Sequence, residues 1–427
     1  MAGLPEHLLS GGRTGASRQS KMKATTLPAF LFARLARIVV HVLVRASLLA
    51  LVATGCSAIA ADAVDMNCDK EEQRLLRRGT TNFIFENDLF TKSDRQYTNG
   101  LKLSVTTPPI SDGQKTKCLF EWVPGLNNLL LKFTAKGSNV PVTMTLTMLA
   151  QEMYTPDQRD TKELIKNDRP YGGWLYGSYG VNARIDHGEK GPSELHSVEV
   201  QIGIVGPASG AKETQDIIHR AFDYKLFQGW ANQLKNEPAF LVHYEYKYKP
   251  KSVFTISGEW GWSSISHAGV TFGKVASYLN AGTALRIGRN IPDDFGTSPI
   301  RPGGNNNAPL RTDVQADKAA PHTPRLGRNG LSAHLYLSLD ARAVANNIFL
   351  NGNTWRESHS VPMRHFVTDA AFGGAIIGRC WKVAAGRVIR SKEFYLQPHS
   401  QKFGSILVAF EDGFFDNLFG AHNHCST

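Results

Sequence analysis

The most chemically informative part of this 427-residue chain is segment 82–103, where oxygen-bearing side chains gather between two short apolar stretches. It contains the pair Asn87–Asp88, the pair Asp94–Arg95 and the run Tyr97-Thr98-Asn99-Gly100. A simple hairpin needs a turn and alternating apolar residues, and it does not need this many oxygen groups at one end. Hard cations such as Ca²⁺ are bound by oxygen ligands of this kind. The segment therefore predicts a cation site with Asp88 as the metal ligand.

The three central residues of this segment must converge if they form one site. Asn87 and Asp88 are adjacent, so on a regular strand their side chains point to opposite faces. Both can serve one site only where a bulge or bend interrupts the strand, or where one acts through its backbone. Thr98 is expected on the neighbouring strand, with its hydroxyl facing the same cluster. The alternative for Asp88 is a turn-capping or solvated carboxylate.

A second chemical candidate lies further along the chain, in residues 211–222, whose pattern predicts a helix. Gln215 and His219 are spaced i, i+4 and therefore share one face of that helix. A histidine can take a proton from water near neutral pH, which makes His219 a candidate general base. Gln215 is placed to position a water molecule or the imidazole. The alternative is that His219 is an ordinary solvated histidine of a surface helix.

The first sixty residues read as a targeting segment. Three arginines precede the apolar run 46–54, and the small residues Ala58-Ile59-Ala60 follow it. This order is typical of a secretory signal peptide, and the apolar run is too short for a stable membrane helix. The sequence thus predicts a signal segment over 1–60 and one mature domain over 61–427.

The charge of the mature domain is mild. Residues 1–60 hold seven of the 48 Lys and Arg residues and one of the 37 Asp and Glu residues, which leaves 41 basic and 36 acidic residues and a net charge of +5. That value gives no reason to expect a nucleic-acid partner, and it is compatible with anionic lipid. Four cysteines remain, and a secreted destination permits disulfides. Cys68–Cys118 with Cys380–Cys425 is the simplest of three possible pairings.

Alternating apolar and polar residues dominate the mature domain, as in 195–207 and 331–341. Apolar-out, polar-in alternation is typical of a transmembrane barrel, although a soluble β-sandwich alternates in the same way. Stretches of about 10 residues or more suit tilted membrane strands. Twelve strands are expected, near 81–90, 98–107, 142–153, 171–184, 195–206, 239–249, 252–265, 275–288, 331–344, 362–378, 381–396 and 403–411.

The expected fold is therefore all-β, a twelve-stranded antiparallel transmembrane β-barrel with a short helical insertion near 211–222. An even strand count suits a bacterial outer-membrane protein, so the predicted location is the outer membrane of a Gram-negative cell. Residues 289–330 are polar and rich in glycine and proline, and they are expected to form an irregular extracellular loop.

Four sequence blocks resemble the lipid A 3'-O-deacylase family of outer-membrane barrels, and they occur in order over the first half of the mature chain. The blocks are Asn87–Asp88 with Tyr97–Gly100, then 149–156, then 167–178, and finally 203–207 leading through Gln215 and His219 to Trp230 and Gln233. The resemblance implies a twelve-stranded barrel and a calcium-dependent esterase. Asn87, Asp88, Thr98, Gln215 and His219 match the positions of the family's site.

One departure from the family concerns charge. The family can carry a glutamate a few residues after the histidine, and that spacing gives Lys225 in this chain, with Asp223 nearby. Either Asp223 takes over the role or the charge of the site differs. Glu237 is a further candidate acid. Arg169, in the motif 168–173, is a candidate contact for a lipid phosphate, whereas the glycines of that motif point to tight backbone packing.

The resemblance implies that the enzyme hydrolyses the ester of the 3'-linked acyloxyacyl chain of lipopolysaccharide, with Ca²⁺ as cofactor and with lipid A and outer-membrane lipids as partners. His219 would activate a water molecule, so no serine nucleophile is needed. Two other readings remain open. The barrel can be a channel or adhesin without this chemistry, or it can be a barrel phospholipase with a serine nucleophile. The sequence does not indicate an oligomeric state.

Overall fold

The computed structural model describes residues 79–88, 96–107, 109, 140–188, 191–250, 253–296, 331–378 and 381–411, all within one compact unit, Met66–Thr427. The predicted signal segment, the four cysteines of the mature domain and the pair Asp94–Arg95 lie outside these residues. Among the helices described, none has the length and hydropathy needed to cross a membrane.

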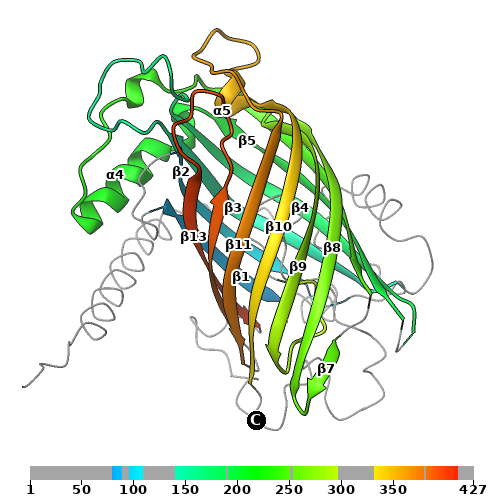
Figure 1. The fold of residues 1–427 in the computed structure, drawn as a ribbon. Coiled ribbons are helices and arrows are strands. Elements are labelled where there is room, and N and C mark those ends of the chain that lie inside the picture. The colour runs from blue at the N-terminus through cyan, green and yellow to red at the C-terminus, as the bar shows by residue number, and fades with distance from the viewer. Residues whose placement is uncertain are drawn as a thin grey trace, which may run out of the picture. The chain divides into compact units, whose positions relative to one another are not determined.

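The strands form one antiparallel sheet that closes on itself (Figure 1). Neighbours in the chain pair with each other, β1 pairs with β13, and β6 pairs with β8 to complete the ring. The strands are β1 (Thr80–Asn87), β2 (Gln96–Thr106), β3 (Val142–Thr155), β4 (Gly172–Asp186), β5 (Ser193–Val205), β6 (Glu237–Lys249), β7 (Phe254–Ser257), β8 (Trp260–Gly273), β9 (Ala276–Arg289), β10 (Ser332–Asn347), β11 (Phe366–Ile377), β12 (Trp381–Arg390) and β13 (Gln401–Glu411). The helices are α4 (Ala211–Phe222) and α5 (Ile348–Asn351).

The predicted twelve-stranded barrel is confirmed, because β7 lies outside the closed ring and twelve strands make the wall. The predicted strand 252–265 is wrong. A turn at Gly258, with φ 54°, divides it into β7 and the start of β8. Phe254 pairs with Trp262 and stacks on it at 4.4 Å, so the alternation continues across the hairpin. A pattern of period two therefore does not reveal this turn.

The wall has a polar inner face and an apolar outer face. Inward-facing charges are buried and paired, as in the contact of 3.5 Å between Lys102 Nζ and Glu199 Oε1. Outward-facing Ile202, Leu335 and Phe366 are 68%, 66% and 79% exposed. This orientation resolves the alternation in favour of a barrel, because a soluble sandwich would turn the apolar face inward.

The two insertions belong to opposite ends of the barrel. Helix α4 follows β5 at the end where β1 meets β2, whereas segment 290–296 follows β9 at the end where β1 begins and β13 ends. The described start of the loop 289–330, which the sequence predicts to be extracellular, thus lies at the opposite end of the barrel from α4, and its remainder lies outside the described residues. Its described part turns into the barrel, where Phe295 packs with Leu195 and Ile265.

Candidate functional site

The amide candidate Asn87 and the carboxylate candidate Asp88 lie where β1 ends. Asn87 is its last residue and Asp88 has already left the strand, so alternation no longer separates their side chains. Asn87 pairs with Asn99 of β2, and its Nδ2 donates a hydrogen bond of 3.2 Å to Asn99 Oδ1. Asn87, Asp88 and Asn99 are all buried. The bend that a shared site requires is therefore present.

A bulge in β2 presents Thr98 to the same face. The register with β3 shifts between Tyr97 and Asn99, which leaves Thr98 as the extra residue. Tyr97 points into the lumen, where its hydroxyl donates to Glu86 at 3.0 Å. Thr98 Oγ1 lies 2.7 Å from Thr155 Oγ1 on the outer face. The bulge thus lets Thr98 and Asn99 both face outward, together with Asn87.

Helix α4 covers this face of the wall from outside. It packs on β3 and β4, and its buried residues Ala211, Gln215 and His219 recur every four positions. The approach is close at Gly173, where a Cβ atom would lie 2.1 Å from Ser209 Oγ and 2.3 Å from Ala211 Cβ. The glycine in the motif 168–173 thus has the structural role that the sequence predicted.

His219 is held in one orientation by the backbone. Its Nδ1 lies 2.6 Å from the carbonyl oxygen of Lys225. A carbonyl only accepts hydrogen bonds, so Nδ1 carries the proton and Nε2 carries the lone pair of the neutral ring. The rings of Phe227 and Tyr224 meet the imidazole edge-on at 5.5 and 6.1 Å. His219 is therefore a buried, oriented base and not a solvated histidine.

Gln215 is oriented by an aromatic partner. The indole Nε1–H of Trp230 donates to Gln215 Oε1 at 2.7 Å, and both side chains are buried. Trp230 also belongs to a cluster with Met153, Ala211 and Phe227. Gln215 thus lies one helical turn from the base, with its carbonyl oxygen already engaged.

The wall residues and the helix residues meet at β3. Met153 pairs with Asn99 across the sheet and packs against Ala211 and Trp230. Two residues away, Gln151 Nε2 donates to the backbone oxygen of Ser209 at 2.6 Å, which ties the start of α4 to the wall. All five predicted site residues are buried: Asn87, Asp88 and Thr98 where β1 ends and β2 begins, and Gln215 and His219 on α4.

Other predicted residues have different roles. Lys225 and Asp223 are exposed, so neither side chain replaces the glutamate of the family in this structure. Glu237 accepts hydrogen bonds from the backbone of Thr354 at 2.9 Å and from Asn353 at 3.1 Å, which explains it as a rim contact. The side chain of Arg169 is fully buried, 3.3 Å from a carboxylate oxygen of Glu393, which fits an internal ion-pair network and not a contact with a lipid phosphate.

Three contacts of the site were not predicted. They are the partners of Gln215, Thr98 and Asn87, namely Trp230, Thr155 and Asn99. The sequence contained a signal for the contact between Asn87 and Asn99, because two antiparallel strands joined after residue 87 place these positions side by side. The contacts of Trp230 and Thr155 depend on the path of α4 and on the bulge, which leave no local pattern.

The donor set fits a hard cation only in part. Asp88 brings a buried carboxylate, and Asn87 and Thr98 bring neutral oxygens, which are the ligand types of Ca²⁺. Within the part of the chain that the structure describes, no three His, Cys, Asp or Glu residues group as metal ligands. A single carboxylate indicates weak binding, because affinity rises with the number of charged ligands.

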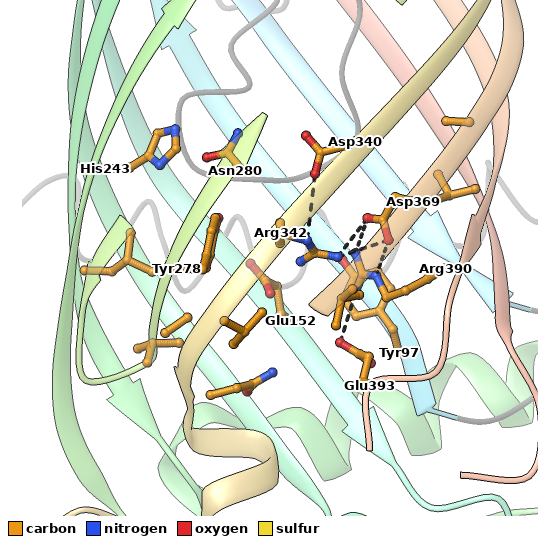
Figure 2. A pocket seen from close by; sticks show the side chains of 18 of the residues that line it. Tyr97, Glu152, His243, Tyr278, Asn280, Asp340, Arg342, Asp369, Arg390 and Glu393 are labelled. Atoms are coloured by element: carbon orange, nitrogen blue, oxygen red, sulfur yellow. Dashed lines mark hydrogen bonds and ion pairs between the residues drawn. The ribbon is translucent and has the colours of Figure 1, made fainter. Parts of the chain in front are cut away.

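The lumen contains a second cavity, of about 150 Å³, lined by charged residues (Figure 2). Several of its charges are paired. Asp369 accepts from Arg342 and Arg390 at 2.9 to 3.0 Å, and Asp340 lies 2.7 Å from His267. Arg342, Arg390 and Lys247 each face an acid, so the arrangement resembles a structural lumen network more than a reactive site.

The fold and the site together define a class. This is an outer-membrane β-barrel with a polar, histidine-containing site on its outer wall, beneath a helix, and not in its lumen. The chain belongs to the outer membrane protein LpxR family, which matches residues 46–411. This is the lipid A 3'-O-deacylase family that the four sequence blocks resemble, so that resemblance is confirmed.

One solved structure, that of LpxR, supports the fold. LpxR from Salmonella typhimurium superposes with a TM-score of 0.55 at 16% identity, covering 78% of this chain and 99% of that one. The β domain of the Bordetella autotransporter BrkA gives a TM-score of 0.38 at 10% identity, covering 78% and 98%. At these identities the likeness to LpxR supports the fold alone. No curated protein matches the chain by sequence.

Proposed function

We propose that this protein is a calcium-dependent ester hydrolase that removes the 3'-linked acyloxyacyl chain from lipid A of lipopolysaccharide. The observation that supports this most is the orientation of His219, whose Nδ1 is held by the Lys225 carbonyl at 2.6 Å while the ring is buried on α4, the helix that packs on β3 and β4. A base on the wall of a barrel meets membrane lipids, whereas a base in the lumen would meet water-soluble substrates.

The reaction follows from the residues of the site. His219 Nε2 takes a proton from a water molecule, and the resulting hydroxide attacks the ester carbonyl carbon. The tetrahedral adduct collapses, the bond between that carbon and the 3' oxygen breaks, and the imidazolium returns the proton to the leaving oxygen. The products are a free acyloxyacyl fatty acid and lipid A with a 3' hydroxyl group.

Asp88, Asn87 and Thr98 are the residues that would hold the cation. When bound there, calcium would polarise the ester carbonyl and stabilise the negative charge that develops on its oxygen. Asp88 neutralises part of the charge of the cation in a buried region, where an uncompensated ion would be costly. We place the α4 end of the barrel at the outer leaflet, where lipid A resides.

Two alternatives have less support. A channel would need an open lumen, and the lumen of this barrel carries paired buried charges and the inserted Phe295. A phospholipase of the serine type would orient its histidine with a carboxylate. In this protein the backbone carbonyl of Lys225, and not a carboxylate, orients the histidine, His219. Neither alternative gives a role to the cluster of Asp88 and Thr98 beneath α4.

The test is mass spectrometry of lipid A after incubation of the detergent-refolded protein with lipopolysaccharide, in calcium and in chelator. We expect loss of one acyloxyacyl unit with calcium and no loss with chelator. Tandem mass spectrometry assigns the lost chain to the 3' position. If a demonstrably folded barrel removes no chain in either condition, the proposal is wrong. Loss from another position would retain the hydrolase and reject the 3' specificity.

A further inference from the structure

The amide of Gln215 has two different environments. Its Oε1 accepts a hydrogen bond of 2.7 Å from Trp230 Nε1. Its Nε2 is buried and has no hydrogen-bond partner among the described residues. A buried amide group without a partner is destabilising, so such a group in a native site calls for an explanation.

The chemistry of Trp230 determines which amide atom faces which way. An indole N–H is a donor only, and an amide offers an acceptor oxygen and a donor nitrogen. Oxygen must therefore face Trp230, since the reversed amide would bring two donors together. The two N–H bonds of Gln215 then point away from the indole, on the helix face that also carries His219.

Trp230 is itself held firmly. Its ring lies 5.0 Å from that of Tyr171, and it packs with Met153 and Ala211 between the helix and the wall. It occupies the short 3₁₀ helix Trp230–Asn232, which follows Gly229. A Cβ atom at Gly229 would approach the Tyr171 ring to 2.6 Å, so the backbone is also closely packed here. The indole of Trp230 is thus a rigidly held donor that orients the amide of Gln215.

We infer that Trp230 is a positioning residue that fixes the Gln215 amide with its N–H donors, and not its oxygen, facing the reacting ester. The inference rests on the proposed hydrolysis. In that reaction the donors of Gln215 hydrogen-bond the carbonyl oxygen of the ester and its oxyanion, which pre-oriented donors stabilise. It also removes Gln215 from the candidate cation ligands, because its oxygen is engaged by Trp230.

Kinetic coupling between the two residues tests this inference. Trp230→Phe keeps a ring and removes the N–H, which lets the amide rotate. We expect kcat to fall about three- to tenfold with KM unchanged, since one neutral hydrogen bond is lost. Gln215→Leu removes the donors, and adding Trp230→Phe to it should then cause no further loss of kcat. Trp260→Phe, at an exposed position on β8, is the matched control and should retain full activity.

A spectroscopic measurement reads the contact without activity. In nitrogen-15 spectra of the detergent-solubilised protein, the indole N–H resonance of Trp230 is the one lost in Trp230→Phe. We expect Gln215→Leu to shift that resonance and to leave the Trp260 resonance in place. Calcium titration by calorimetry should give the same affinity for Gln215→Leu as for the wild type.

The outcomes separate the inference from the proposed function. Independent, multiplicative losses of kcat in the double variant, an unmoved Trp230 resonance, or weaker calcium binding in Gln215→Leu would each overturn the inference. A wild-type protein that leaves lipid A intact while the Trp230 resonance shifts as expected would overturn the proposed function and retain the amide orientation.

Discussion

At the scale of single residues, the site is built by contacts that orient polar atoms before substrate arrives. A backbone carbonyl orients His219, and an indole orients Gln215. Since the carbonyl of residue 225 is present with any side chain, the change from an acid to Lys225 leaves the imidazole orientation intact. What that change alters is the charge near the proposed cation site, and the two effects can be tested separately.

The first prediction concerns the base. His219→Ala removes the only imidazole of α4, and we expect the rate of acyl-chain release to fall about 10²- to 10⁴-fold, the usual contribution of general base catalysis. The measurement is release of fatty acid from lipopolysaccharide. His187→Ala is the control, because His187 is an exposed histidine beyond the far end of β4. Equal activity of His219→Ala and wild type would contradict the assigned mechanism.

The second prediction concerns the cation. Asp88→Asn removes the buried carboxylate, and we expect calcium affinity to fall about tenfold or more. Lys225→Glu introduces an acid where the family can carry one, and affinity should rise. Lys235→Glu, an exchange of the same charge at another exposed position, is the control. Isothermal titration calorimetry measures all three, and identical affinities for Asp88→Asn and wild type would place the cation elsewhere.

The sequence singled out candidate site residues that prove to be buried, but it did not show how they are held. Asn87, Asp88, Thr98, Gln215 and His219 came from residue chemistry and family resemblance, and all are buried. The role of Trp230 required the three-dimensional path of the chain after α4. The bulge at Thr98 was likewise not predictable, because one extra residue in a strand has no periodic signal.

At the scale of elements, the position of α4 depends on small residues of β4. Gly173→Ala places a Cβ atom 2.1 Å from Ser209 Oγ, so the helix must move away from the wall. We expect activity to be largely lost and the barrel to remain folded, with overpacking costing about 1–3 kcal/mol. Gly177→Ala is the matched control on the same strand, because its Cβ atom would come no closer than 3.4 Å to Thr147.

Heat-modifiable migration in gel electrophoresis reports the folded barrel in these glycine variants, and lipid A mass spectrometry reports their activity. Equal activity of Gly173→Ala and Gly177→Ala would show that close packing of α4 is not required.

Element boundaries show where periodicity fails as a predictor. The helix predicted at 211–222 has these bounds in the structure. Gly210 and Asp223, both in left-handed conformations, end it sharply. The strand predicted at 381–396 ends at Arg390 instead. Residues beyond it turn over the rim, where Glu393 pairs with Arg169.

At the scale of the whole molecule, the lumen is closed from the end opposite α4 by segment 290–296. Asp293 pairs with Arg184 at 2.9 Å and with Lys249, and Asp294 pairs with Arg286. Such buried pairs cost several kcal/mol to break by removing one partner, because a charge is left without compensation. The segment therefore fills part of the lumen at that end; we call it the plug and expect it to hinder conduction.

The plug should tolerate mild acid. Burial alone would raise the pKa of Asp294, but the nearby charges of Arg286, Lys382 and His334 hold that pKa well below its usual range. A carboxyl whose pKa is lower in the folded state stabilises the fold fully above its unfolded pKa, about 3.9, and loses this contribution as the pH falls further. The difference in the free energy of unfolding between the wild type and Asp294→Asn should therefore be the same at pH 5 and at pH 7. Chemical denaturation of the refolded barrel measures it.

Conductance decides between an enzyme with a sealed barrel and a channel. We expect the wild-type protein to give no steady conductance in planar bilayers at pH 7. Replacing Asp293 and Asp294 together by Asn leaves Lys249 and Arg286 buried without these carboxylates, so the plug should loosen and conductance steps should appear. Glu259→Gln, which changes a partly exposed acid paired with Arg289 at the same end, should stay closed.

Steady conductance in the wild type would show that the plug leaves a path, and the channel would again compete with the hydrolase. A silent wild type with a conducting double variant would mean that the chain uses its lumen for closure and its outer wall for chemistry.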